Sequence, residues 1–170
     1  MKRSVGLWQL LGFAVTALGG TLLHFLYDLT GGSALVAPFS AVNESTFEHM
    51  KLLFWPMLLY ALLEGIHFGD RRDFVCIKLR GITLGLALIP ILFYTYNGAV
   101  GKSPDWLNIA IFFIAAAVAY LYETKQLKRP ERPCSTRLAT VLLLIVALLF
   151  FVFTRNPPEI GLFRDPLAGG

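Results

Sequence analysis

The chain has 170 residues; 56% are hydrophobic, 15% are charged, and the net charge is +4. An average soluble domain has about 25% charged residues, and a soluble fold of this length cannot bury so much apolar side chain. The composition therefore excludes an ordinary soluble protein and predicts an all-α integral membrane bundle, with a single domain over residues 1–170. Because the basic residues lie beside apolar segments, membrane lipids are the expected partners and nucleic acid is not.

Five apolar segments, separated by short polar connections, set the predicted architecture. With their polar flanks they predict transmembrane helices at about residues 7–26, 50–68, 78–97, 105–122 and 138–154. Each is close to the ~20 residues that cross ~30 Å of hydrocarbon. The first segment follows a basic start, as in a secretory signal peptide, but it lacks a small-residue cleavage site and is expected to remain as a helix.

The distribution of lysine and arginine predicts the orientation of the helices, because cytoplasmic loops retain these residues. Eleven of the fifteen lie at the N-terminus or in the second and fourth connections: Lys2, Arg3, Arg71, Arg72, Lys78, Arg80, Lys125, Lys128, Arg129, Arg132 and Arg137. The N-terminus is therefore predicted to be cytoplasmic and the C-terminus to lie outside. Cys76 and Cys134 then face the cytoplasm, where thiols stay reduced, so no disulfide is expected.

Small residues predict where helices pack closely, and prolines predict where helices bend. Gly12, Thr16 and Gly20 follow one another at four-residue spacing, which permits close approach of another helix. This face is expected either to pack inside the bundle or to form the seam of a homo-oligomer. Pro56 and Pro90 each remove a backbone hydrogen bond and are expected to kink the second and third helices.

The connection between the first two helices is expected to be structured. Residues 31–40 open with glycine and are then too apolar for a solvated loop, so they should pack on the outer ends of the helices as a lid. Ser45 and Glu48 stand three residues apart at the start of the second helix and predict a capping box. In it, Ser45 accepts from the Glu48 amide and the Glu48 carboxylate accepts from the Ser45 amide.

Polar residues on the outer side form the first candidate site. The catalytic candidates are His24, Glu44, Glu48, His49 and Lys51, and the two histidines lie at the same depth under the predicted topology. All but Lys51 offer nitrogen or oxygen ligands for a divalent metal such as zinc. Two other interpretations stay open: histidines satisfied by hydrogen bonds, or a metal-free acid/base site with Ser40 or Ser45 as the nucleophile.

A second polar group is predicted near the cytoplasmic ends of the helices. Glu64 and His67 are three residues apart, which aligns them on one helical face. Sixteen residues of helix place Glu64 ~24 Å from Glu48, too far for the two groups to share one metal. Glu64 is expected to pair with Arg71 or Lys78, and a polar path between the outer and inner groups is the alternative.

The segment after the last helix carries the remaining polar candidates, Arg164 and Asp165. Residues 155–166 contain three prolines and leave the last helix on the outer side, so they are expected to fold back over that surface. Arg164 can then pair with Glu44 or Asp28.

Three motifs together resemble a bacterial family of small, about five-span membrane proteins of unknown function. They are His24 at the end of the first segment, Asn43-Glu44-Ser45-x-x-Glu48-His49-x-Lys51 followed by Phe54-Trp55-Pro56, and Leu162-Phe163-Arg164-Asp165-Pro166. The resemblance implies a multi-pass protein of the bacterial cytoplasmic membrane with helices around an outer polar site, and it implies no reaction, cofactor or partner.

The residues favour a small membrane hydrolase or transferase that acts on a lipid or envelope precursor. The alternative is a small permease, or an accessory or assembly subunit without catalytic activity.

Overall fold

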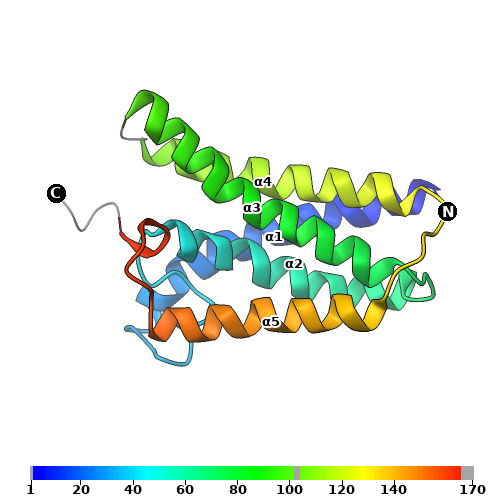
Figure 1. The fold of residues 1–170 in the computed structure, drawn as a ribbon, viewed down its shortest axis with the longest axis horizontal. Coiled ribbons are helices and arrows are strands. Elements are labelled where there is room, and N and C mark those ends of the chain that lie inside the picture. Colours follow the sequence, from blue (N-terminus) through cyan, green and yellow to red (C-terminus); the bar gives the residue numbers. More distant parts are fainter. Residues whose placement is uncertain (1, 102–103, 166–170) are drawn as a thin grey trace.

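The computed structural model describes residues 2–101 and 104–165, and over these residues it contains five α-helices and no strand (Figure 1). The helices are α1 (Lys2–Leu29), α2 (Thr46–Phe68), α3 (Phe74–Val100), α4 (Asp105–Leu127) and α5 (Thr136–Arg155), followed by the short 3-10 helix η1 (Gly161–Phe163). All five α-helices are long and apolar enough to cross a membrane. The predicted all-α, five-helix class is confirmed, and each predicted segment lies inside one helix. Two residues used in the sequence analysis lie outside the described residues. They are Lys102, one of the fifteen basic residues, and Pro166, the last residue of the tail motif.

Polar side chains begin two of the helices. The Ser45 hydroxyl accepts the Glu48 amide at 3.4 Å, and the Ser135 hydroxyl accepts the Leu138 amide at 3.3 Å. Each hydroxyl satisfies one of the amides that have no partner at a helix start. α2 continues through Pro56 and α3 continues through Pro90. Both positions at which kinks were predicted therefore lie inside continuous helices.

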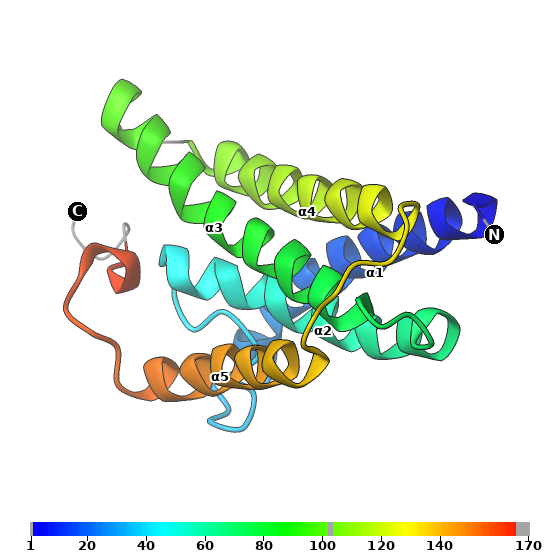
Figure 2. The same ribbon diagram turned by 45° about the vertical axis from the view of Figure 1, so that its right-hand side comes forward.

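Successive helices run antiparallel, and the two ends of the chain lie at opposite ends of the bundle (Figure 1). We call the end with the α1–α2 connection and the C-terminal tail the outer end, and the end with the α2–α3 and α4–α5 connections the inner end. α1 packs against α2 and α4, while α3 packs against α2, α4 and α5. Figure 2 shows the C-terminal part of α3 and the start of α4 leaning away from α2 and α5.

The bundle is apolar both inside and outside. Its core includes Leu53, Phe54, Ala115, Ala116 and Ala119, each 0% exposed. On the outer surface of the bundle, Leu18 is 73% exposed and Leu144 is 62% exposed. Helices that are apolar on every face are typical of membrane spans, whose outward side chains contact lipid.

The face with Gly12, Thr16 and Gly20 packs inside the chain. A Cβ atom on Gly12 would lie 2.5 Å from a ring carbon of Tyr60, and one on Gly20 would lie 2.4 Å from a ring carbon of Phe112. Thr16 is fully buried, and its hydroxyl lies 2.8 Å from that of Tyr120. These contacts account for the small residues, so a homo-oligomer would have to use another surface; oligomerisation itself stays a prediction.

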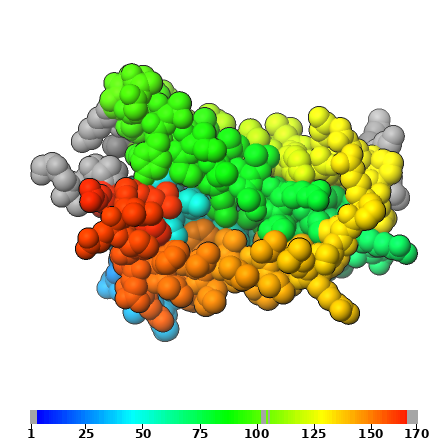
Figure 3. All heavy atoms as spheres, viewed as in Figure 1, coloured from blue at the N-terminus to red at the C-terminus, as the bar shows by residue number. Residues whose placement is uncertain are grey.

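The α1–α2 connection and the C-terminal tail both pack on the outer ends of the helices, as predicted. In the connection, the Pro38 carbonyl accepts the Trp55 indole N–H at 2.9 Å, and the Phe39 ring lies 4.9 Å from that of Trp55. In the tail, the Phe163 ring lies 4.5 Å from that of Phe47 in α2. Figure 3 shows the tail lying against α3 and α5 at this end.

Cys76 and Cys134 are joined by a disulfide, so the prediction of two reduced thiols is wrong. The Cα atoms lie 6.5 Å apart although 58 positions separate the cysteines in sequence. They meet because α3 begins beside the connection that leads into α5, where the Cys76 sulfur also approaches the Ser135 carbonyl at 3.8 Å.

Candidate functional site

His24, Glu44 and His49 meet at the outer end of the bundle. His24 lies near the end of α1, His49 lies in the first turn of α2, and Glu44 lies in the connection between them. The Glu44 carboxylate stands between the two imidazoles: Oε1 is 3.6 Å from His24 Nε2, and Oε2 is 3.5 Å from His49 Nε2. One ligand atom from each residue lies within 4.8 Å of the others. The structure therefore brings together three of the four predicted metal ligands.

The hydrogen bond of His49 fixes which ring nitrogen carries hydrogen. His49 Nδ1 lies 2.9 Å from the Ser45 carbonyl oxygen, and because a carbonyl only accepts, Nδ1 must donate. In neutral His49 the lone pair of Nε2 then faces the Glu44 carboxylate. Two acceptors that face each other at 3.5 Å leave room for a bridging group, and a metal ion is one group that both can bind.

Each histidine lies at a ligand-like distance from one oxygen of the Glu44 carboxylate. Two ligand atoms bound at ~2.1 Å to tetrahedral zinc lie about 3.4 Å apart, close to the two separations at Glu44. The Ser45 carbonyl behind His49 is the kind of partner that orients a metal-bound imidazole. Buried His24 Nδ1 has no hydrogen-bond partner among the described residues, and His24 Nε2 faces Glu44. Three protein ligands leave a fourth position open, as in catalytic zinc sites.

These three residues form one end of a cavity of about 360 Å³ between α1, α2 and α4. Asn108 of α4 adds a polar group, and most of the remaining wall is apolar. The cavity is lined by Gly20, Thr21, His24, Phe25, Glu44, His49, Leu52, Asn108, Ile109, Phe112 and Phe113. Phe25 is 55% exposed and Ile109 is 59% exposed, so the cavity reaches the apolar surface between α1 and α4. Asn108 was not among the predicted residues, although it is the one amide within its apolar segment.

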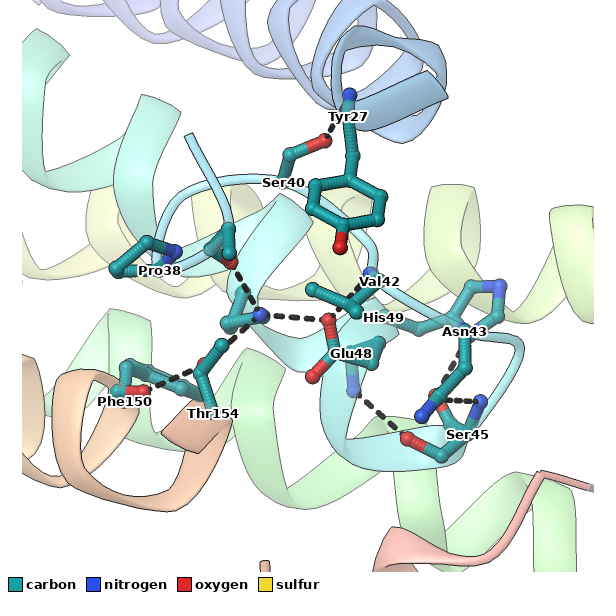
Figure 4. Close-up of polar contacts among 12 residues, drawn as sticks. Tyr27, Pro38, Ser40, Val42, Asn43, Ser45, Glu48, His49, Phe150 and Thr154 are labelled. Atoms are coloured by element: carbon teal, nitrogen blue, oxygen red, sulfur yellow. Dashed lines mark hydrogen bonds and ion pairs between the residues drawn. The ribbon is translucent and has the colours of Figure 1, made fainter. Parts of the chain in front are cut away.

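Glu48 and Lys51 lie outside this site, in contrast to the prediction. Lys51 is fully buried, and its ammonium contacts the Glu48 carboxylate at 2.6 Å, the Ala37 carbonyl at 2.8 Å and the Thr154 hydroxyl at 3.0 Å (Figure 4). Its three hydrogens thus have three partners. Lys51 therefore ties the α1–α2 connection and α5 to α2, and the Glu48–Lys51 pair has a structural role.

The capping box is half correct. Ser45 does accept the Glu48 amide, but the Ser45 amide donates to Asn43 Oδ1 at 2.9 Å, and the Glu48 carboxylate accepts the Val42 amide at 2.8 Å (Figure 4). Glu48 is held by Lys51 and Val42, so it is not available as a fourth ligand beside His49.

The two predicted serine nucleophiles are both engaged in hydrogen bonds. The Ser40 hydroxyl donates to the Leu23 carbonyl and accepts the Tyr27 amide at 2.9 Å, which closes the end of α1. Ser45 is the N-cap of α2. Neither serine lines the cavity.

In the tail, Asp165 and not Arg164 reaches the site. Asp165 Oδ2 accepts the Glu44 amide at 3.4 Å. Arg164 is exposed, and among the described residues it forms no ion pair with Glu44 or Asp28, so that predicted pairing is wrong. The tail thus helps to position the backbone of Glu44.

The predicted Glu64–His67 pair is not formed. Glu64 is fully buried and pairs with Lys78, which was one of the two partners expected for it, while His67 is exposed and its ring packs 4.6 Å from the Trp8 ring. Lys78 also contacts Glu123 at 2.5 Å. Glu123 was assigned to a polar connection, yet its four-residue spacing after Ala119 was a signal that it continues the buried face of α4.

At the inner end, Asp73 organises the connections. Its carboxylate accepts Arg71 Nε at 3.1 Å and the Arg132 amide at 3.0 Å. Burial alone would raise the pKa of Asp73, but the hydrogen bonds from Arg71 and Arg132 and the charge of Arg71 outweigh it, and the pKa lies below its usual value. The α2–α3 and α4–α5 connections are therefore joined by an ionised carboxylate.

The comparison with protein families identifies the family of the chain. One family model matches residues 1–170. The chain belongs to DUF6512, a family of unknown function. No curated protein and no solved structure matches the chain. Membership of DUF6512 agrees with the resemblance to a family of unknown function, and the site must be interpreted from its own geometry.

Proposed function

We propose that this DUF6512 protein is a multi-pass protein of the bacterial cytoplasmic membrane and a hydrolase that acts on an amphiphilic ester or amide. The distribution of lysine and arginine favours an N-terminus inside, although this orientation places the Cys76–Cys134 disulfide at the cytoplasmic end, where disulfides are uncommon. A divalent metal ion held by His24, Glu44 and His49 is the cofactor of the hydrolase. The observation that carries the proposal is that these three side chains converge at the polar end of an apolar cavity that reaches the apolar surface between α1 and α4.

The shape of the cavity supports an amphiphilic substrate. The apolar wall, which includes Leu52, Phe112 and Phe113, suits an acyl chain, and the polar end suits the bond to be cleaved. Such a molecule can enter between α1 and α4 without leaving the bilayer. Among the described residues that line the cavity there is no lysine or arginine, the residues that usually bind phosphate, so a carboxylic ester or amide fits better than a phosphate ester.

A divalent ion with an open coordination position could activate a water molecule for hydrolysis. A bound divalent ion lowers the pKa of a water molecule to about 7 and polarises a carbonyl oxygen. The water oxygen forms a bond to the acyl carbon, and the bond from that carbon to the leaving oxygen or nitrogen breaks. One proton of the water goes to the leaving group and the other is released from the new acid. Asn108 adds an amide group to the wall of the same cavity.

The test is metal binding by the full chain, purified through a tag without histidine and placed in lipid nanodiscs. Zinc is titrated in competition with a chromophoric chelator. The expected result is one ion per chain, with affinity reduced by about 100-fold or more in His24→Ala and His49→Ala, because even a change behind a ligand costs 10–100-fold.

His67→Ala is the matched control, because His67 is remote from the site and packs against Trp8. It should bind zinc as the unmodified chain does. Equal loss in all three variants, or no stoichiometric ion in the unmodified chain, contradicts the metal site. If zinc binds as expected but no chromogenic acyl ester or amide in the nanodisc is hydrolysed, the site stands and the hydrolase proposal fails.

A further inference from the structure

We propose that a second site, formed by Glu64, Lys78 and Glu123 at the inner end of the bundle, binds one exchangeable proton at neutral pH. It is independent of the outer metal site. Glu64 on α2 and His49 are fifteen residues apart, or ~22 Å along the helix. The two sites would therefore act on opposite sides of the bilayer.

Four helices contribute to this inner cluster. Lys78 of α3 contacts both the Glu64 carboxylate of α2 and, at 2.5 Å, the Glu123 carboxylate of α4. Gln9 of α1 donates its amide hydrogen to Glu64. Glu64 and Glu123 are 0% exposed, Gln9 is 2% exposed and Lys78 is 3% exposed, so water does not reach the charges in this state.

The charges of the cluster do not balance. Two carboxylates and one ammonium leave a net charge of −1 when all three are ionised. Among the residues whose side chains the structure describes, the other titratable groups coupled to these carboxylates are the phenols of Tyr60 and Tyr120, which cannot supply a positive charge. Tyr60 donates to the Trp8 carbonyl at 2.7 Å, and the Tyr120 hydroxyl is bonded to Thr16. An uncompensated charge inside a membrane bundle is strongly unfavourable, and a proton on one carboxylate removes it.

The hydrogen bonds point to the same missing proton. Glu123 Oε1 is buried and has no partner among the described residues, and the same is true of Gln9 Oε1. Both atoms are acceptors without a donor. A charged oxygen that no donor stabilises is costly when buried, so a proton on Glu123 is the less costly state. Gly81 of α3 makes room for this carboxyl group, since a Cβ atom there would lie within 2.3 Å of Glu123 Oε1.

The position of the cluster allows exchange with the inner face. Glu64 and Glu123 each lie four residues before the end of their helix, and Lys78 lies four residues after the start of α3. Four residues correspond to ~6 Å of helix, so one turn of structure separates the cluster from the basic inner connections. A proton that binds and leaves at this site could therefore be coupled to a change in how the four helices pack.

Infrared spectroscopy of the full chain in nanodiscs tests this count, since a protonated carboxylic acid has a carbonyl band that a carboxylate lacks. At neutral pH the unmodified chain should show one such acid per chain. Glu123→Gln and Glu64→Gln should each remove the band, because the remaining carboxylate and Lys78 then balance. Lys78→Met should give two protonated acids, because no cation remains.

Glu44→Gln is the control, since Glu44 is partly exposed, and it should leave the band unchanged. The spectra are compared in sodium and in choline buffers. A band that persists in Glu64→Gln and Glu123→Gln, or a folded unmodified chain without any band, overturns the proposal. A band seen in choline and lost in sodium also overturns it, because the site then binds a metal cation and not a proton. Using both glutamine variants, with folding checked by circular dichroism, keeps the test decisive if one of them fails to fold.

Discussion

Replacing Lys51 with Met should destabilise the protein strongly, because it leaves the Glu48 carboxylate buried without its partner. The Lys51 side chain is 0% exposed and that of Glu48 is 5% exposed, and the charged atoms are 2.6 Å apart. Breaking such a pair by removing one partner costs about 3–5 kcal/mol. The Ala37 carbonyl loses a hydrogen bond at the same time, which adds to the cost if water cannot replace it.

The double variant Glu48→Gln with Lys51→Met separates the charge from the packing. Neither side chain is then charged, so the penalty for a buried unpaired carboxylate disappears. What remains is the loss of the hydrogen bonds to Ala37 and Thr154, so we expect about 1–3 kcal/mol of destabilisation. The double variant should thus be more stable than Lys51→Met alone.

The assay is unfolding by titration with a denaturing detergent, followed by circular dichroism. Lys125→Met is the control, because Lys125 is exposed on α4 and a surface change of this kind is worth about 0.5 kcal/mol or less. The reasoning is refuted if Lys51→Met is as mild as Lys125→Met, or if the double variant is no more stable than the single one.

Two further predictions concern the inner half of the bundle. Gly81→Ala places a Cβ atom 2.3 Å from Glu123 Oε1 and should destabilise the protein by about 1–3 kcal/mol through overpacking. Gly98→Ala is the control, because it is also in α3 but has no atom within 4 Å of the new Cβ, and it should be neutral or stabilising by up to ~1 kcal/mol. Unfolding titrations that find Gly98→Ala the more destabilising of the two would contradict the described packing. The lowered pKa of Asp73 means that its stabilising contribution is complete above the usual Asp value of ~3.9 and is lost as the pH falls through the lowered pKa. Asp73→Asn should therefore reduce stability at neutral pH and make the unfolding midpoint less sensitive to acid, and an unchanged acid profile would show that the Arg71 and Arg132 contacts carry no stability.

The helices could be predicted from the sequence because each requires only a run of apolar residues of sufficient length. The proximity of His24 and His49 could be predicted too, since one lies at the end of a helix and the other at the start of the next, which must return from the same side. Glu44 lies in the connection between these two helices, so its position at the same end of the bundle could be predicted as well.

The role of Glu48 could not be predicted, because the contacts that hold its partner come from elsewhere in the fold. Glu48 is held by Lys51, whose position depends on Ala37 in the connection and Thr154 in α5. Lys78 was correctly among the partners expected for Glu64, but its second contact, with Glu123 of α4, was not predicted, because it depends on how α3 and α4 pack.

Contacts between distant segments were equally hidden from local patterns. The disulfide between Cys76 and Cys134 depends on α3 and α5 starting side by side, which no spacing in the sequence indicates. Glu123 shows what a closer inspection of periodicity would have found, because it follows Ala115 and Ala119 at four-residue intervals on the face that packs against α3.

X-ray absorption spectroscopy of zinc bound to the full chain in nanodiscs is the most direct measurement of the proposed centre. The proposal predicts a first shell of nitrogen and oxygen only, with the outer-shell pattern of two imidazoles, which falls to one imidazole in His49→Ala. A sulfur ligand, fewer than two imidazoles in the unmodified chain, or a spectrum unaffected by His49→Ala would contradict a metal centre built from His24, Glu44 and His49.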